Sequence, residues 1–432
     1  MNLSNLRRVQ IKKRTATRWI ALVILFLPFV FSCLTELLKL PGVIRFSADL
    51  LIIISVIIVS FNAILNRRYF VSRVTSVLGI LVSVFFLYTL VAYLFNYQSA
   101  FYYIWGFRNN FRFFAAFFLF ISFFELEDIE DIFKAFDVLF WIHFVVILVQ
   151  FFVFRYEQDF LGGIFGTQKG CNGYVVVFLT IVITRSMLSF MNEKEKMYLC
   201  FLKSAAALLV AALAELKIFF FIFIVVLLLS SMITSFSAKK AALMLGGALL
   251  IIIAYTLLVA LFEYFDNFLS VDFLINTLFQ SNYASDEDMG RFTSIAYICN
   301  RFLTTVPERL FGMGLVKCDV SSIAIFNTSF YDMYVDTHYS VLSIAFMFIE
   351  TGFIGLIMYL SFFAICLGYS IFWFKKRMGN RFFNQMGIVI SVLCFVLVFY
   401  NSSLRLEAGY MVYFVLALPF IGVASEEQRL LK

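Results

Sequence analysis

Charged residues are scarce in this chain. They make up 14 % of its 432 residues, against about 25 % in soluble domains. Apolar residues make up 63 %, where soluble domains have roughly 45–50 %. This balance excludes a soluble globule, a disordered chain and a nucleic-acid-binding protein, and it predicts an all-α polytopic membrane bundle.

Proline is also rare, with four residues, and no Gly/Ser-rich or Pro-rich linker divides the chain. The sequence shows no internal repeat. We therefore expect residues 1–432 to form a single integral-membrane domain.

Histidine is limited to two residues, and the seven cysteines are scattered. No CxxC pair and no His–Cys spacing typical of a metal site occurs, so neither a metal nor a cofactor is predicted. Cys299 and Cys318 share one hydrophilic segment and could form a disulfide if that segment faces an oxidising compartment.

The apolar residues fall into twelve runs, each long enough, or nearly so, to cross about 30 Å of hydrocarbon. Because lipid offers peptide groups no hydrogen-bond partner, these runs predict about twelve transmembrane helices. Run 111–124 is short, and 200–235 could instead form one broken helix pair. The predicted spans are 19–38, 47–65, 74–96, 111–124, 137–154, 173–191, 200–214, 218–235, 241–262, 345–373, 384–403 and 409–424.

Basic residues gather in the connections on one side of the predicted bundle, which the positive-inside rule makes cytoplasmic. An even number of spans places both termini on that side. The first run exceeds the apolar length of a signal peptide and no small-residue cleavage site follows it, so we expect it to be retained. The clustered basic residues are Arg7, Arg8, Lys12, Lys13, Arg14, Arg18, Arg67, Arg68, Arg73, Lys194, Lys196, Lys203, Lys239, Lys240, Lys375, Lys376, Arg377 and Arg381.

The opposite side carries one large loop, predicted over residues 263–337. Loops of this length are usually functional or disordered, and this one is not of low complexity. Within it, RFTSIAYICNRFL has apolar residues at helical spacing, which predicts an amphipathic helix on the membrane surface.

Ionisable residues at the edge of the hydrocarbon are candidates for function. Lys217 follows Glu215 in LVAALAELKIFFFIF, at the outer end of a predicted helix pair. A simple alternative is that both side chains reach the interface from a short turn. We favour function, because Lys217 lies on the same side as the large loop.

Arginines accumulate on the same side. Arg291 opens the predicted amphipathic helix after an acidic run, and Arg301 and Arg309 follow it. Guanidinium groups bind phosphate through paired hydrogen bonds, so the cluster suggests a phosphorylated ligand. Solvated charges balanced by nearby carboxylates remain the alternative, above all for Arg301 and Arg309. Supporting candidates on this side are Arg112, Arg155 and Lys169.

His338 lies where the large loop enters the span that follows it. An imidazole is neutral near pH 7 and can take a proton from a hydroxyl, and Asp336 could orient it. The alternative is an ordinary residue at a helix start. His143 is surrounded by apolar residues and is interpreted as a buried, hydrogen-bonded side chain.

GRFTSIAYICNRFLTTVPERLFGMG and THYSVLSIAFMFIETGFIGLIMYL resemble the bacterial O-antigen polymerase and O-antigen ligase family. GIFGTQKGCNGYVVVFL is similar to the family's lead into a span, with Asn172 at its asparagine. Lys217 stands where many members have an arginine; it keeps the charge and loses the bidentate fork. The matching motif residues are Arg291, Gly312, Gly314, His338, Glu350, Gly352 and Gly355.

The resemblance implies a GT-C-like bundle in the bacterial inner membrane, with the large loop in the periplasm. It implies a metal-independent, inverting glycosyltransferase that uses oligosaccharides carried on undecaprenyl diphosphate. His338 would be the general base on the acceptor hydroxyl, while Arg291 and Lys217 would hold the diphosphate. Membrane lipid is an expected partner, a chain-length regulator is a further one that the resemblance allows, and nucleic acid is not expected.

Four roles remain open at this point, one of them a purely structural membrane scaffold. A repeat-unit polymerase for O-antigen, capsule or exopolysaccharide is favoured. An O-antigen ligase would transfer the glycan to lipid A core instead. A transporter of lipid-linked glycans or small solutes belongs to another class and is disfavoured, because transporters usually bind at the bilayer midplane between repeated halves.

Overall fold

The computed structural model describes residues 3–65, 73–96, 99–168, 170–234, 238–262, 289–319 and 328–430. Within these ranges the chain is helical and contains no β-strand, which confirms the all-α prediction. The long helices are α1 (Leu3–Ser32), α2 (Ser47–Leu65), α3 (Ser76–Phe95), α4 (Ala100–Phe123), α5 (Leu126–Phe152), α6 (Asn172–Met191), α7 (Met197–Leu213), α8 (Lys217–Met232), α9 (Ala238–Leu261), α14 (Ser343–Lys376), α15 (Arg381–Tyr400) and α16 (Gly409–Leu430).

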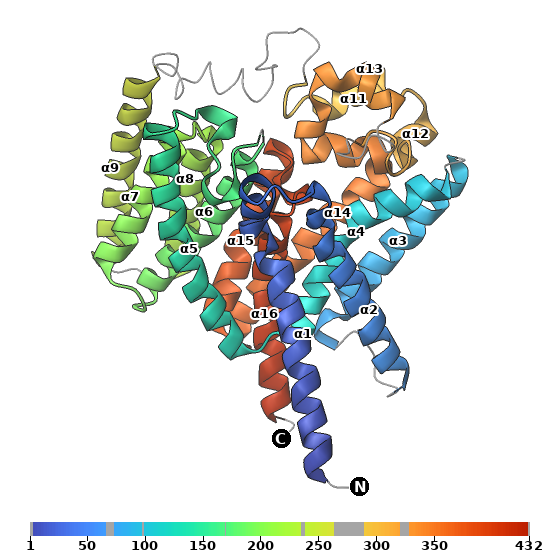
Figure 1. The fold of residues 1–432 in the computed structure, drawn as a ribbon, viewed down its shortest axis with the longest axis horizontal. Coiled ribbons are helices and arrows are strands. Elements are labelled where there is room, and N and C mark those ends of the chain that lie inside the picture. The colour runs from blue at the N-terminus through green and yellow to red at the C-terminus, as the bar shows by residue number, and fades with distance from the viewer. Residues whose placement is uncertain are drawn as a thin grey trace.

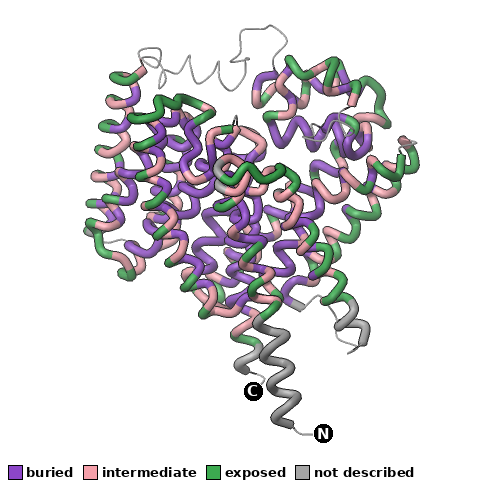
Figure 2. The backbone as a smooth tube through the Cα atoms, viewed as in Figure 1, coloured by how far each residue is buried: buried purple, intermediate pink, exposed green. Residues whose placement is uncertain are grey.

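The helices form one bundle with a buried centre (Figures 1 and 2). Helix α16 packs against α4 and α15, and α14 packs against α15 and α3. On one flank α6 packs against α7 and α8, while α9 packs on α7 at the edge. Most of the α6 and α16 side chains are buried, whereas α3 and α9 expose large apolar residues on their outer faces.

Eight helical segments of the described residues are long and apolar enough to cross a membrane, which makes the chain a multi-pass membrane protein. Three shorter apolar helices, Ala16–Ser32, Met197–Leu213 and Lys217–Met232, accompany them. Helix α4 is in neither group, because its first half carries the polar sequence RNNFR. The eight segments are Gly42–Ser60, Ser76–Phe95, Leu126–Phe152, Asn172–Met191, Lys240–Leu261, Ser343–Lys376, Arg381–Tyr400 and Gly409–Glu427.

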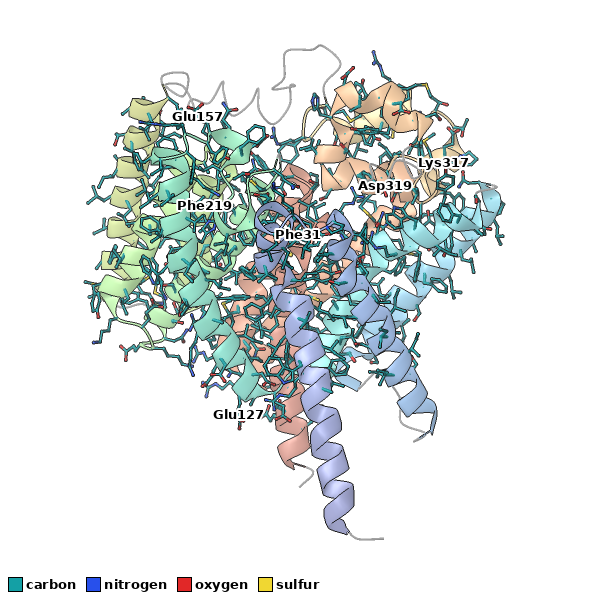
Figure 3. The ribbon with its side chains drawn as sticks, viewed as in Figure 1. Phe31, Glu127, Glu157, Phe219, Lys317 and Asp319 are labelled. Carbon is teal, nitrogen blue, oxygen red and sulfur yellow. The ribbon has the colours of Figure 1, made fainter. Side chains whose placement is uncertain are left out.

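Several connections predicted to share one side do meet at one end of the bundle. The turn between α14 and α15 contacts the end of α16 through a hydrogen bond from the Gly379 amide to Glu426. The α6–α7 turn contacts the start of α15 through Asn192 Nδ2, which donates to Gln385 Oε1 over 2.7 Å. We call this the basic end, and Figure 3 shows Glu127, at the start of α5, lying there as well.

Three short helices lie at the other end, over the side of the bundle that holds α3, α4 and α14 (Figure 1): α11 (Ser294–Arg301), α12 (Val306–Phe311) and α13 (Ser329–Tyr334). We call residues 289–319 and 328–341 the cap. The predicted amphipathic helix is α11, which buries Ser294 and Ile298. Residues 263–288 and 320–327 of the predicted loop lie outside the described residues.

Aromatic side chains hold the cap together. The Phe302 ring lies 5.0 Å from Phe330 and 4.7 Å from Tyr334, centroid to centroid. Tyr339 is fully buried beside them, and its hydroxyl donates to the Cys318 carbonyl over 2.6 Å. This packing brings the two described parts of the cap together just before α14 begins.

Candidate functional site

Two glycine-containing segments interlock where the cap meets α14. The amides of Met313 and Gly314 donate to the carbonyls of Ile349 and Glu350 over 2.8 and 3.0 Å. Gly312 and Gly352 have positive φ of 72° and 61°, a backbone region that favours glycine. The Gly-x-Gly turn and the Glu-x-Gly segment quoted above are therefore one structural unit.

Glu350 anchors this unit inside the bundle. Its side chain is 1 % exposed. Oε1 accepts from the Val316 amide over 2.6 Å, and Oε2 accepts from Asn110 Nδ2 of α4 over 3.2 Å. The Tyr88 hydroxyl of α3 lies 2.6 Å from the Thr351 carbonyl oxygen. The cap is thus fixed to α3, α4 and α14 together.

Lys217 is the first residue of α8, at the capped end of the bundle. Glu215, with φ of 52°, reverses the chain between α7 and α8, and buried Leu216 holds the turn in place. The predicted helix pair is therefore two separate helices. The Lys217 side chain is half-buried, and its ammonium lies within electrostatic range of Glu215 and Arg291.

Arg291 stands at the start of the cap and reaches α15. Its guanidinium carbon lies 4.3 Å from the centre of the Tyr400 ring, and Phe292 packs on Phe399 at 5.7 Å. Lys217 and Arg291 therefore lie within electrostatic range of each other, although one precedes and the other follows residues 263–288 in the sequence.

His338 belongs to the same neighbourhood. The Met289 amide, close to Arg291, donates to the Thr337 carbonyl over 3.3 Å. His338 is half-buried between two single 3-10 turns, Val335–Thr337 and Tyr339–Val341, with φ of 52°. A non-glycine residue in this region is strained, and such strain clusters at functional sites.

Arg112 lies inside the bundle and is paired with carboxylates. It is 8 % exposed, and Nη1 pairs with Asp49 at 3.4 Å and with Glu407 at 3.3 Å. Tyr410 donates to Asp49 over 2.9 Å, and Arg108 pairs with the same carboxylate. Arg112 thus belongs to a buried ion-pair network that joins α2, α4 and α16.

The remaining supporting candidates divide between packing and exposure. Arg309 donates to the Leu303 and Cys299 carbonyls over 2.9 and 3.0 Å, which closes the C-terminal end of α11. Arg301 donates to the Tyr297 hydroxyl over 2.9 Å. Arg309 therefore stabilises the cap, whereas the Arg301 contact lies on its exposed surface.

Arg155 follows α5 and is exposed. Asp336 is exposed too, and in the described part of the chain no hydrogen bond joins it to His338, so the predicted orienting contact is not formed. Lys169 lies outside the described residues.

The thiols and the other histidine also have defined places. Cys299 and Cys318 are free thiols, and Cys318 is buried; the disulfide considered above is not formed. His143 is fully buried, and its Nδ1 accepts from the Ile164 amide over 3.4 Å, as predicted for a packing role. Among the described residues, no three His, Cys, Asp or Glu side chains are grouped to hold a metal.

The sequence alone did not single out Asp49, Glu407 or Arg405 as candidate residues. Asp49 and Glu407 are single acidic residues beside apolar runs. Their role becomes visible only in the structure, where both pair with the buried Arg112. Arg405 lies in the 3-10 turn Ser403–Arg405 between α15 and α16, at the capped end.

Comparisons with protein-family models, with curated proteins and with solved structures find no match to this chain.

Proposed function

We propose that this chain is a repeat-unit polymerase for a cell-surface polysaccharide. It would transfer a glycan from undecaprenyl diphosphate to a sugar hydroxyl of a second lipid-linked repeat. The observation that carries the proposal is the meeting of Lys217, Arg291 and the segment leading to His338 at the end of the bundle opposite the basic loops.

The paired cations suit a diphosphate leaving group. Two positive side chains within electrostatic range of each other, both half-buried, repel one another, and a dianionic ligand relieves that repulsion. Negative charge grows on the leaving oxygen in the transition state, so preplaced cations stabilise it more than the ground state. Removing one comparable preorganised donor lowers kcat by about 10²–10³.

His338 serves as the base in this proposal. The acceptor oxygen attacks the anomeric carbon while the bond from that carbon to the diphosphate oxygen breaks. The acceptor proton passes to the imidazole, and polyprenyl diphosphate leaves with the bonding electron pair. Attack from the face opposite the leaving group inverts the anomeric centre.

We place all twelve long helices in the bacterial inner membrane in a GT-C-like arrangement, with the cap in the periplasm and both termini in the cytoplasm. The positive-inside rule supports this orientation, because basic connections gather at the end opposite the cap. Helix α4 can cross the membrane despite its arginines, because Asp49 and Glu407 neutralise them inside the bundle.

A cellular test separates the two possible acceptors. In a strain that depends on this chain, His338→Ala should leave single lipid-linked repeats to accumulate and abolish the polymer ladder. Arg291→Lys should keep part of the activity, since the other proposed diphosphate-binding residue, Lys217, is itself a lysine. A normal ladder in the His338 variant would contradict the assignment of the base, and glycan appearing on lipid A core in the wild type would favour the ligase.

A further inference from the structure

Arg405 occupies a rigid position at the capped end. Its carbonyl accepts from Arg112 Nη2 over 3.1 Å, and its amide donates to Ser402 over 2.9 Å. The guanidinium carbon lies 3.0 Å from the centre of the Phe346 ring in the first turn of α14. The backbone is held on one side and the side chain is supported on the other, so the guanidinium direction is set before any ligand binds.

The N–H donors of the Arg405 guanidinium remain available for a ligand. Over the described ranges it makes no side-chain hydrogen bond and no ion pair, although the residue is only partly exposed. Three other arginines of this region use some of theirs: Arg108 and Arg112 on carboxylates, and Arg309 on carbonyls. A partly desolvated guanidinium with five free N–H groups is costly unless an oxyanion completes it.

The nearby Glu350 side chain does not complete it. Arg405 lies within electrostatic range of Glu350 and Cys318. Both Glu350 oxygens already accept hydrogen bonds, from Val316 and Asn110, and no ion pair to Arg405 is formed in the described structure. Glu350 therefore leaves the guanidinium donors of Arg405 unoccupied.

Arg405 also lies over a different ring from Arg291: its guanidinium lies over Phe346 of α14, whereas that of Arg291 lies over Tyr400 of α15. The charges that act on Lys217 are those of Glu215 and Arg291, whereas Arg405 acts on the group around Glu350. We propose that Arg405 is a second phosphate-binding position, which binds one oxyanion of a polyprenyl diphosphate through its planar guanidinium. This inference rests on the proposed function: a polymerase that joins two lipid-linked repeats handles two diphosphates, and a single cation pair serves only one.

The test measures binding directly. The full chain in phosphatidylcholine nanodiscs is dialysed against radiolabelled farnesyl diphosphate, with farnesol and inorganic pyrophosphate as competitors. The variants are Lys217→Gln with Arg291→Gln, Arg405→Gln, the triple combination, and Arg405→Lys, which keeps the charge. Lys317→Gln is the matched control, because Lys317 is an exposed cap cation (Figure 3) that makes no ion pair among the described residues.

We expect the unchanged chain to bind two equivalents of farnesyl diphosphate and the Lys217/Arg291 double variant to keep one. Adding Arg405→Gln to the double variant should weaken the remaining site tenfold or more, by the usual worth of charge-assisted hydrogen bonds, and Arg405→Lys should weaken it less. Equal competition by pyrophosphate would show that the diphosphate alone is recognised, and weaker competition would show that the lipid contributes.

Unchanged binding in every Arg405 variant would overturn this inference and leave the proposed function intact. Loss of all binding in the double variant would overturn it too, because no independent second site would exist. If the unchanged chain binds farnesyl diphosphate no better than farnesol, the proposed function fails together with the inference.

Discussion

Replacing Gly352 with alanine probes the connection between the cap and the bundle. Gly352 has φ of 61° and ψ of −168° inside α14, a conformation that is almost restricted to glycine. An added Cβ would lie 2.4 Å from the Leu310 carbonyl oxygen and 2.6 Å from the Gly312 amide nitrogen. Both neighbours are backbone atoms, so the turn must move away from α14.

The cost has two parts. Forcing alanine into this backbone region costs about 1–3 kcal/mol. Displacing the turn breaks the two hydrogen bonds donated by Met313 and Gly314, each worth about 0.5–1.5 kcal/mol. The sum is about 2–6 kcal/mol, a large part of the roughly 5–15 kcal/mol that stabilises a native protein.

The assay compares Gly352→Ala with Gly368→Ala in the purified chain. Gly368 lies on the same helix, and an added Cβ there meets no atom within 4 Å, so its variant should stay within about 1 kcal/mol of the wild type. We expect Gly352→Ala to lower the melting temperature by several degrees and to abolish the polymer ladder. A Gly352 variant that melts and polymerises like the Gly368 variant would refute the docking argument.

Three further predictions concern residues whose surroundings differ from what the sequence alone suggests. Arg112→Gln should destabilise the chain by about 3 kcal/mol or more, seen as lost membrane abundance, because it leaves buried carboxylates without their cation; Arg301→Gln should stay within about 0.5 kcal/mol, and equal effects would contradict the network assignment. His338→Asn should melt with the wild type, because asparagine tolerates left-handed backbone, yet form no polymer; retained polymer would remove the base. Burial raises the pKa of the Cys318 thiol, so maleimide should label Cys299 faster than Cys318 at pH 8; identical rates would contradict the burial of Cys318, and a mobility shift on reduction would contradict two free thiols.

Most spans could be predicted because a run of apolar residues is by itself enough to identify a membrane-spanning helix. The prediction 173–191 matches α6 at Asn172–Met191, and 241–262 matches α9 at Ala238–Leu261. Helices that begin with polar residues were predicted too short. Helix α5 was predicted from residue 137 and begins at Leu126, where Asp128 completes a capping box with Glu125.

Helix α4 shows why composition is insufficient there. Its predicted span was 111–124, but the helix runs over Ala100–Phe123. The polar residues that shortened the prediction are compensated by distant partners: Arg108 by Asp49, Asn109 by Asp319, and Asn110 by Glu350. Such compensation exists only in the folded bundle, so no local pattern reveals it.

The candidate site could be predicted only where a local feature of the sequence marks the residue. A cation at a span edge is unusual in any sequence, so Lys217 and Arg291 stood out, and the structure places them within electrostatic range. Arg405 did not stand out, because NSSLRLEAGY reads as an ordinary polar turn. What distinguishes Arg405 is visible only in the structure. Its carbonyl accepts a hydrogen bond from Arg112, while its own guanidinium makes no hydrogen bond among the described residues.

The most direct test of the account is reconstitution of the purified chain with its lipid-linked repeat units, followed by quantification of polymer and of released polyprenyl diphosphate. The account predicts a ladder of two or more repeats, one polyprenyl diphosphate released per new linkage, and no ladder when Lys217 and Arg291 are both replaced by glutamine. A ladder without diphosphate release, or an undiminished ladder from that double variant, would contradict the claim that these two cations hold the leaving group.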